Sequence, residues 1–305
     1  MDLGSRPSVT PLSGILNVDK PADWTSFDAV NVIRKRTGVK RVGHAGTLDP
    51  AATGVLPLLL GQATRLTEYL VDATKTYRAR IQLGIETDTY DLEGAVTAEA
   101  DVSGVTRDAI EAALPEFRGE IEQTPPAYSA IKRQGVPLYK LARRGEAVVV
   151  EPRRVRVDRL DITSYEAPML EVVIDCSKGF YVRSLAHDIG ARLSVGGSLA
   201  GLVRTRVGSF RIEDAVSVDD LTREIEAGVW QERLFAPDEV LLHWRAAILG
   251  QANALRLSRG QMLELAGATA PEGELCRAYS VGGDFLAVIA ANETRWRPEK
   301  VFAAR

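Results

Sequence analysis

The most restrictive feature of this 305-residue sequence is a strict alternation of apolar and polar side chains at residues 75–84, KTYRARIQLG. Its apolar side consists of Tyr77, Ala79, Ile81 and Leu83, and its polar side of Thr76, Arg78, Arg80 and Gln82. A period of two predicts a β-strand with one buried face. Residues 14–21, 153–163 and 169–176 also read as strands, and regular helical crossovers between strands are missing. We therefore expect a mixed α/β fold of the α+β type, with helices on a mixed, largely antiparallel central sheet.

Helical patterns flank these strands. Residues 25–38 carry Asp28 near the start and three bases before Gly38, which suits the helix dipole and a glycine C-cap. Further helices are expected at residues 62–71, 106–114, 136–145 and 182–193. Pro115 is expected to end the helix at 106–114.

The C-terminal segment follows a different pattern. The sheet pattern lapses around residues 237–252, and three short segments follow at 255–263, 276–290 and 294–302. The Gly282-Gly283 pair between alternating runs predicts a β-hairpin. We expect an N-terminal tail at 1–13, a main domain at 14–236 and a small β-rich module at 246–305.

Composition limits the class of protein. Hydrophobic residues make up 45% and charged residues 26%, as in an ordinary globular protein. The longest apolar run, residues 55–60, falls well short of the roughly 20 residues that a membrane helix needs. The N-terminus lacks a basic segment followed by an apolar one, so we expect a cytoplasmic protein. The two distant cysteines do not form a disulfide framework or a paired metal motif.

Charge is distributed unevenly. The net charge is −3, and residues 86–122 hold eleven acids against two bases. Residues 132–159 instead hold nine bases against three acids, and residues 34–41 hold five bases and no acid. Each basic block taken alone is most often a solvated face. Two such blocks flanking a candidate site predict a groove for a polyanion.

The strongest candidate site is GHAGTLDPAATG, residues 43–54. It holds one acid, Asp49, between a glycine-rich turn and a proline, directly before the apolar run 55–60. Taken alone, Asp49 is equally consistent with an Asx turn. Scattered histidines and the missing HExxH, GxGxxG, GxxxxGK[ST] and GxSxG motifs argue against metal, nucleotide-loop and serine-elbow chemistry. We expect neither a metal nor a cofactor.

Several motifs, in this order, resemble the TruB-type tRNA pseudouridine-55 synthases. They are LNVDKPADWTS (16–26), GHAGTLDPAATGVLPLLLGQATR (43–65), TKTYRARIQLGIETDTYDLEG (74–94), PPAYSAIKRQGVPLYKLARRG (125–145), SKGFYVRSLAHDIG (177–190) and LVRTRVGSF (202–210). The resemblance implies a pseudouridine synthase fold with a C-terminal PUA-like RNA-binding module. It also implies a cofactor-free isomerase that acts on the T arm of tRNA, as a monomer without an obligatory protein partner.

The resemblance also implies roles for single residues. Asp49 is implied to be the catalytic nucleophile, Tyr77 to pack on the target base and Arg183 to pair with Asp49. His44, Tyr181 and Leu202 are implied to line the nucleotide pocket. An ionised carboxylate beside the apolar run 55–60 needs a cationic partner, which is consistent with Arg183. Read from the pattern alone, Tyr77 and Tyr181 are also typical core residues, and His44 could merely close the glycine turn.

The RNA-binding candidates come from the basic segments. They are Lys20, Lys132, Arg133, Arg143 and Arg144, the last four in a basic insertion at residues 125–152 that we expect to contact RNA. Lys20 precedes Pro21, where it either contacts RNA or supports the fold.

Two alternative functions stay open at this stage. A noncatalytic RNA-binding or tRNA-folding protein would use the same basic segments, but would not need Asp49, Tyr77, Tyr181 and Arg183 together. A nucleosidase would use a carboxylate near the sugar, but usually needs a second one, and the loop 43–54 supplies only Asp49.

Overall fold

The computed structural model of the 305-residue chain describes residues 12–128, 132–133, 136–137, 150–265 and 270–302, and every structural statement below refers to these residues. Within them, the largest sheet holds ten strands. In spatial order its main path is β14 (Val216–Ser217), β1 (Gly14–Lys20), β3 (Thr53–Leu60), β12 (Gly197–Val207), β4 (Lys75–Leu83), β11 (Met169–Cys176), β10 (Arg153–Glu166) and β7 (Gly119–Gln123). The short strands β2 (Val42–His44) and β13 (Phe210–Arg211) pair with β3 and β12.

The pairing of these strands confirms the predicted mixed, largely antiparallel sheet. The β1–β14 and β3–β12 pairs are parallel, and the other pairs along the path are antiparallel. The alternation that predicted β4 is also present in its burial, because Tyr77, Ala79 and Ile81 are buried while Arg78 and Arg80 are exposed. The apolar run 55–60 lies inside β3 and is fully buried, and β3 is an interior strand of the sheet, between β1 and β12.

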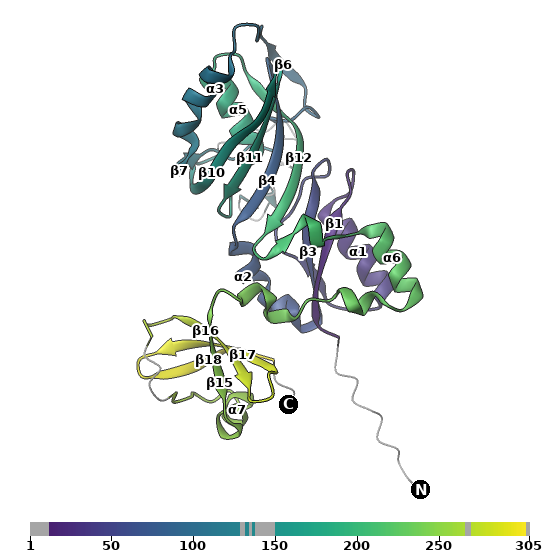
Figure 1. Ribbon diagram of the computed structural model, residues 1–305, viewed down its shortest axis with the longest axis vertical. Helices are drawn as coiled ribbons and strands as arrows, with labels where there is room; N and C mark the ends of the chain where they lie inside the picture. Colours follow the sequence, from purple (N-terminus) through teal and green to yellow (C-terminus); the bar gives the residue numbers. More distant parts are fainter. Residues whose placement is uncertain (1–11, 129–131, 134–135, 138–149, 266–269, 303–305) are drawn as a thin grey trace.

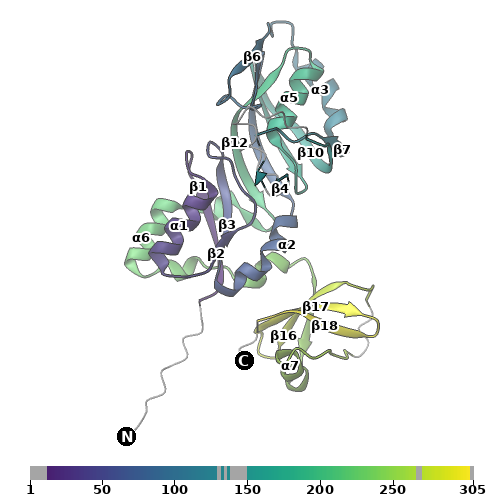
Figure 2. The same cartoon turned by 180° about the vertical axis from the view of Figure 1, so that it is seen from behind.

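Helices cover the sheet in two groups (Figures 1 and 2). The helices α3 (Arg107–Ala113) and α5 (Val182–Arg192) lie beside the half of the sheet that contains β10, β11 and β4. The helices α1 (Ser26–Thr37) and α6 (Val218–Ala227) lie beside β1. A 3₁₀ turn, η1 (Gly61–Leu66), leads from β3 into α2 (Thr67–Asp72).

Local sequence explains the ends of α1. Thr25 and Asp28 form a reciprocal capping box at its start, and Gly38 ends it with a left-handed backbone, φ 71°. This agrees with the prediction for residues 25–38.

The helix α3 ends at Ala113 with Leu114 as its C-cap, directly before Pro115, as predicted. A 3₁₀ turn, η2 (Leu114–Phe117), which was not predicted, follows it; proline fits the first turn of a helix, where its missing N–H is not needed. The helix predicted at 136–145 begins instead with a strand, β9 (Val136–Pro137), paired with β8 (Lys132–Arg133); residues 138–145 lie outside the described part.

A second, four-stranded sheet lies near the C-terminus (Figure 1). It consists of β15 (Arg245–Leu249), β16 (Leu275–Ser280), β17 (Phe285–Asn292) and β18 (Arg295–Val301), with the helix α7 (Gln251–Ser258) against it. The hairpin predicted at Gly282-Gly283 joins β16 to β17, and Gly283 has φ 90°. The sheet contacts the main domain where Arg65 donates to the Val301 carbonyl oxygen at 2.6 Å.

Candidate active site

The loop between β2 and β3 carries Asp49, and the start of α1 and the end of β1 hold its main chain. The Ser26 hydroxyl, at the start of α1, donates to the Leu48 carbonyl oxygen and accepts from the Leu48 N–H. Lys20, at the end of β1, donates to the Pro50 carbonyl oxygen at 3.0 Å. Because these bonds involve the main chain on both sides of Asp49, they fix the loop while the carboxylate itself stays 49% exposed.

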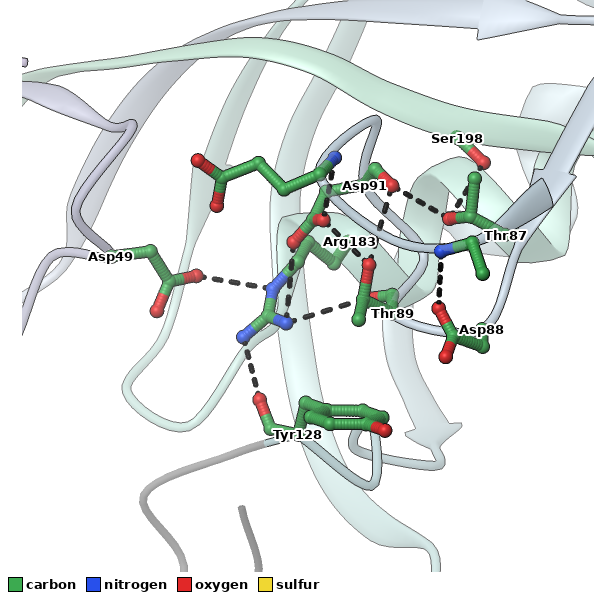
Figure 3. Close-up of polar contacts among 10 residues, drawn as sticks. Asp49, Thr87, Asp88, Thr89, Asp91, Tyr128, Arg183 and Ser198 are labelled. Carbon is green, nitrogen blue, oxygen red and sulfur yellow. Dashed lines mark hydrogen bonds and ion pairs between the residues drawn. The ribbon is translucent and has the colours of Figure 1, made fainter. Parts of the chain in front are cut away.

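Arg183 lies at the start of α5 and reaches the same place (Figure 3). Its Nε is 3.0 Å from Asp49 Oδ2, and its Nη1 is 3.4 Å from Asp91 Oδ2. It also donates to the Thr89 and Tyr128 carbonyl oxygens at 3.3 and 3.0 Å. Four acceptors therefore hold one guanidinium whose side chain is only 9% exposed, and one of these acceptors is the carboxylate of Asp49.

The second carboxylate, Asp91, was not among the predicted site residues. It lies in a loop between β5 (Ile85–Thr87) and β6 (Val96–Glu99), where the Thr89 hydroxyl donates to its Oδ1 at 2.6 Å and the Thr87 hydroxyl donates to its carbonyl oxygen (Figure 3). In the sequence Asp91 is one acid in the acid-rich stretch 86–122, so nothing local distinguishes it. Asp91 becomes a partner of Arg183 only because the folded loop brings its carboxylate there.

A cavity of about 290 Å³ opens beside Asp49 and Arg183. Its lining consists of Gly46, Thr47, Leu48, Asp49, Val71, Lys75, Tyr77, Ser177, Lys178, Gly179, Phe180, Tyr181, Val182, Arg183, Leu202 and Arg204. The predicted residues Tyr77, Tyr181 and Leu202 thus lie around one cavity with the charged pair. The prediction that residues 55–60 form a wall of the site is wrong, because β3 is buried in the sheet. The described lining of the cavity comes mainly from the Asp49 loop, β4, β12 and the segment that enters α5.

Two aromatic residues shape this cavity. Tyr77 is 9% exposed and belongs to a hydrophobic cluster, and its burial raises the pKa of its phenol. It therefore has the burial of a core residue and a place at the cavity at once. Tyr181 precedes α5, and its backbone N–H and carbonyl oxygen both bond to the buried side chain of Gln123, at 2.8 and 3.0 Å.

His44 and Lys20 lie behind the loop. His44 ends β2 and is absent from the described cavity lining; burial lowers the pKa of its imidazole. Lys20 is fully buried, and its ammonium donates to the carbonyl oxygens of Pro21, Trp24 and Pro50. Burial lowers the pKa of Lys20 to about 8. Of the two predicted alternatives for Lys20, this geometry favours a role in stabilising the fold over a surface contact with RNA.

The other RNA-binding candidates are only partly described. Lys132 and Arg133 form β8, whose backbone alone is described, and Arg143 and Arg144 lie outside the described residues. Within the described part of the chain, His, Cys, Asp and Glu do not gather in any group of three or more able to hold a metal ion. In the same part, every helix is too short or too polar to cross a membrane.

Comparisons with known proteins match this arrangement. The model of the TruB family pseudouridylate synthase N-terminal domain matches residues 34–182, and that of the tRNA pseudouridylate synthase B C-terminal domain matches residues 183–243. A tRNA pseudouridine synthase B of Dehalococcoides mccartyi is 40% identical over 292 residues, covering 95% of this chain and 97% of the relative. One of Pseudomonas aeruginosa is 43% identical over 280 residues, with 91% of each chain covered.

Two solved structures contain chains that are similar to this one in fold and in sequence. A Cbf5-Nop10-Gar1 complex contains a chain with TM-score 0.76 and 27% identity, covering 98% of this chain and 88% of that chain. An H/ACA RNP bound to a substrate RNA containing 2′-deoxyuridine gives TM-score 0.74 and 25% identity, covering 96% and 86%. Since relatives at 40% and 43% identity match this chain over 97% and 91% of their own length, the chain belongs to the tRNA pseudouridine synthase B family and is an isomerase that forms pseudouridine in tRNA.

Proposed function

We propose that this enzyme isomerises uridine 55 in the T loop of tRNA, with Asp49 as the catalytic carboxylate. The observation that carries the proposal is the ion pair of Asp49 with the buried Arg183 at a cavity that Tyr77 also lines. The order of the sequence motifs supports the same position on tRNA, and the names of the relatives support tRNA as the substrate.

The reaction asks for groups of this kind. The C1′–N1 bond breaks, the base turns, a bond forms between C1′ and C5, and the proton that C5 loses is balanced by the one that N1 gains. No redox change occurs, so the proposed reaction needs no cofactor. In this proposal Asp49 acts through its ionised oxygen, as a covalent or electrostatic partner of the sugar or base. Arg183 orients that oxygen through their ion pair.

The target base must leave the T loop to reach Asp49. Extruding a nucleotide costs a few kcal/mol, which stacking on an aromatic side chain offsets by about 1 to 3 kcal/mol per base. Tyr77 is the proposed stacking partner, and Tyr181 and Leu202 are proposed to border the base. His44 is also proposed to contact the target nucleotide, although it is absent from the described cavity lining.

We further propose the division of labour along the chain. Residues 14–236 form the catalytic domain, with the insertion 125–152 holding RNA through Lys132, Arg133, Arg143 and Arg144. Residues 246–305 form a PUA-like module that adds contacts to whole tRNA. The enzyme is proposed to act in the cytoplasm as a monomer that needs no protein partner, although the structural neighbours come from multi-component assemblies.

The test is to incubate the protein with an unmodified tRNA transcript and map pseudouridine along it. We expect modification at position 55 alone, and expect an isolated T-arm stem-loop to suffice because the pocket reads local features. A transcript with cytidine at position 55 is the matched control and should remain unmodified. Pseudouridine at other positions with position 55 untouched would overturn the site assignment, and release of free uracil would indicate a nucleosidase.

A further inference from the structure

Every buried charged side chain in the described part of the chain is a cation, and all of them lie at the Asp49 site. They are Lys20, Lys75, Arg183 and Arg204. Burying an unpaired charge is unfavourable, so each needs an explanation. Arg183 has Asp49 and Asp91 as partners. For Lys20 and Lys75, burial lowers the pKa to about 8, so either ammonium can lose its proton under mild alkaline conditions.

Arg204 has neither explanation. A guanidinium does not lose its proton in proteins. Its residue is 1% exposed, and within the described residues it forms no ion pair with an acid. Two of its hydrogen bonds go to main-chain oxygens of the Asp49 loop: Nε donates to the Val55 carbonyl at 2.8 Å and Nη2 donates to the Gly46 carbonyl at 3.1 Å. The Arg204 side chain also forms a hydrogen bond with the Tyr77 side chain.

These two oxygens lie at opposite ends of the loop that carries Asp49. Gly46 is at its start and Val55 is where β3 continues from it. The Arg204 backbone holds the same end again, because it pairs with Gly54 in the parallel β12–β3 ladder. The Arg204 side chain therefore bonds both ends of the loop, and the Arg204 main chain pairs with one of these ends.

The loop sequence is adapted to this contact. Gly54 has φ 103°, and a Cβ there would lie 2.3 Å from the Arg204 carbonyl oxygen. Gly46 has φ 90° and places its carbonyl within reach of the guanidinium. Gly54 lets the two main chains approach closely, and Gly46 adopts the positive φ with which its carbonyl reaches Arg204.

We propose that Arg204 is a positioning residue for the reaction: it sets the span of residues 46–55, so that the Asp49 carboxylate stays against Arg183 and over the cavity. The proposal rests on the function proposed for Asp49. Arg204 also lines the cavity beside Tyr77. Because a displacement of about 1 Å in a reacting group is enough to cost about 100-fold in rate, a guanidinium that fixes the loop has a direct kinetic consequence.

The test compares three full-length variants with wild type on unmodified tRNA. Arg204→Met removes both donors, and Arg204→Lys keeps a charge but replaces the fixed fork of donors with a single ammonium. The matched control is Arg206→Met, two residues along β12, whose side chain bonds Thr76 and Asp175 and not the loop. The measurements are the thermal midpoint, the tRNA dissociation constant and the single-turnover rate of pseudouridine formation at saturating enzyme.

We expect Arg204→Met to bind tRNA as wild type does and to lose about 100-fold in single-turnover rate. Arg204→Lys should lose about 10-fold, and Arg206→Met should keep the wild-type rate even if its thermal midpoint falls. Wild-type rates in either Arg204 variant, or equal losses in Arg206→Met, would overturn the proposal. If Arg204→Met does not fold, Arg204→Lys decides by the same criterion. A wild-type enzyme that leaves uridine 55 unchanged would instead refute the proposed function.

Discussion

Asp49 is half exposed, yet three side chains hold the main chain around it. Ser26 bonds the main chain of Leu48, Lys20 bonds Pro50, and Arg204 bonds the ends of the loop. Arg183 then fixes the carboxylate itself. A group that must meet a flexible RNA substrate can remain accessible only if its position is set by the backbone beneath it.

A first prediction concerns Gly54 in that backbone. Gly54→Ala should lower the free energy of unfolding by about 3 kcal/mol, because the new methyl group meets the Arg204 carbonyl oxygen and the backbone has a positive φ. Chemical denaturation measures the change. Gly104→Ala is the matched control, since a Cβ there meets nothing within 4 Å. Equal stability of the two variants would contradict the proposed close contact between β12 and the loop.

At the residue level, the sequence located one half of the site. The motifs singled out Asp49, Arg183, Tyr77, Tyr181 and Leu202, and the structure brings these residues round one cavity. The sequence motifs did not single out Asp91, Lys75 and Arg204 as site residues. The bond from Arg204 to Gly46 joins residues 158 positions apart, and it exists only because β12 pairs with β3. No local pattern encodes such a contact.

Two elements position Arg183: the helix α5 carries it, and the loop before β6 provides Asp91 and the Thr89 carbonyl oxygen as its partners. Arg183 lies in the first turn of α5, where a cation is unfavourable next to the helix dipole, so its acidic partners must come from elsewhere. One turn later, His187 contacts the same region: its Nε2 is 3.2 Å from Glu86 Oε1, and its ring stacks on Tyr90 with centroids 4.0 Å apart. The helix α5 thus contacts this loop through two side chains, Arg183 and His187.

A second prediction follows from His187. A hydrogen bond with Asp188 is the main cause that raises the pKa of His187, with Glu86 adding to it; Tyr90 is the other titratable group against the ring. A raised pKa means that the folded protein binds the proton more tightly. The stabilisation by charged His187 is therefore complete below about pH 6.5 and is lost as the pH rises through the raised pKa.

Unfolding free energies of wild type and His187→Gln, measured from pH 5.5 to 8.5, check this. The difference should be about 0.5 kcal/mol at the acidic end and should shrink toward the alkaline end. Glu86→Gln removes one partner and should reduce the pH dependence of the difference. A difference that is constant with pH would contradict the charged contact.

Elements with a clear period were predictable and others were not. β4, β10, β11, α1 and α5 follow alternation or helical spacing, and all were expected near their observed bounds. The central strand β3 is apolar throughout because it is buried on both faces, so its period carries no strand signal. The strand β12 mixes glycines and bases that face different surroundings along its length. Their roles depend on neighbouring strands.

At the scale of the whole molecule, the C-terminal sheet packs on the main domain through specific contacts. Tyr69 of α2 meets Trp244 edge to face with centroids 4.8 Å apart, and Arg65 lies over the Phe302 ring at 4.9 Å. Val288 of β17 belongs to the same buried cluster as Ile15 of β1. A module joined in this way keeps a fixed place relative to the main domain, which suits the tRNA contacts proposed for it.

A third prediction concerns the basic insertion 125–152, which is proposed to contact tRNA. The tRNA affinity should fall steeply with salt, because each phosphate contact releases counterions. Charge reversal at Arg143 and Arg144 should flatten this dependence. Charge reversal at Arg107 and Arg192, which pair with Glu111 and Glu116 on α3, η2 and α5, is the matched control and should leave the slope unchanged. Identical slopes for both double variants would place the RNA groove away from the insertion 125–152.

The central claim is that the Asp49 carboxylate performs the isomerisation of uridine 55. Its most direct test is the single-turnover rate of pseudouridine formation at position 55 for wild type and Asp49→Asn, with tRNA affinity measured in parallel. Asp101→Asn, an exposed acid in a turn, is the control. We predict that Asp49→Asn folds and binds tRNA as wild type does while its rate falls by more than about 1,000-fold, because the amide keeps the shape and loses the charge. A rate within about tenfold of wild type would contradict the claim.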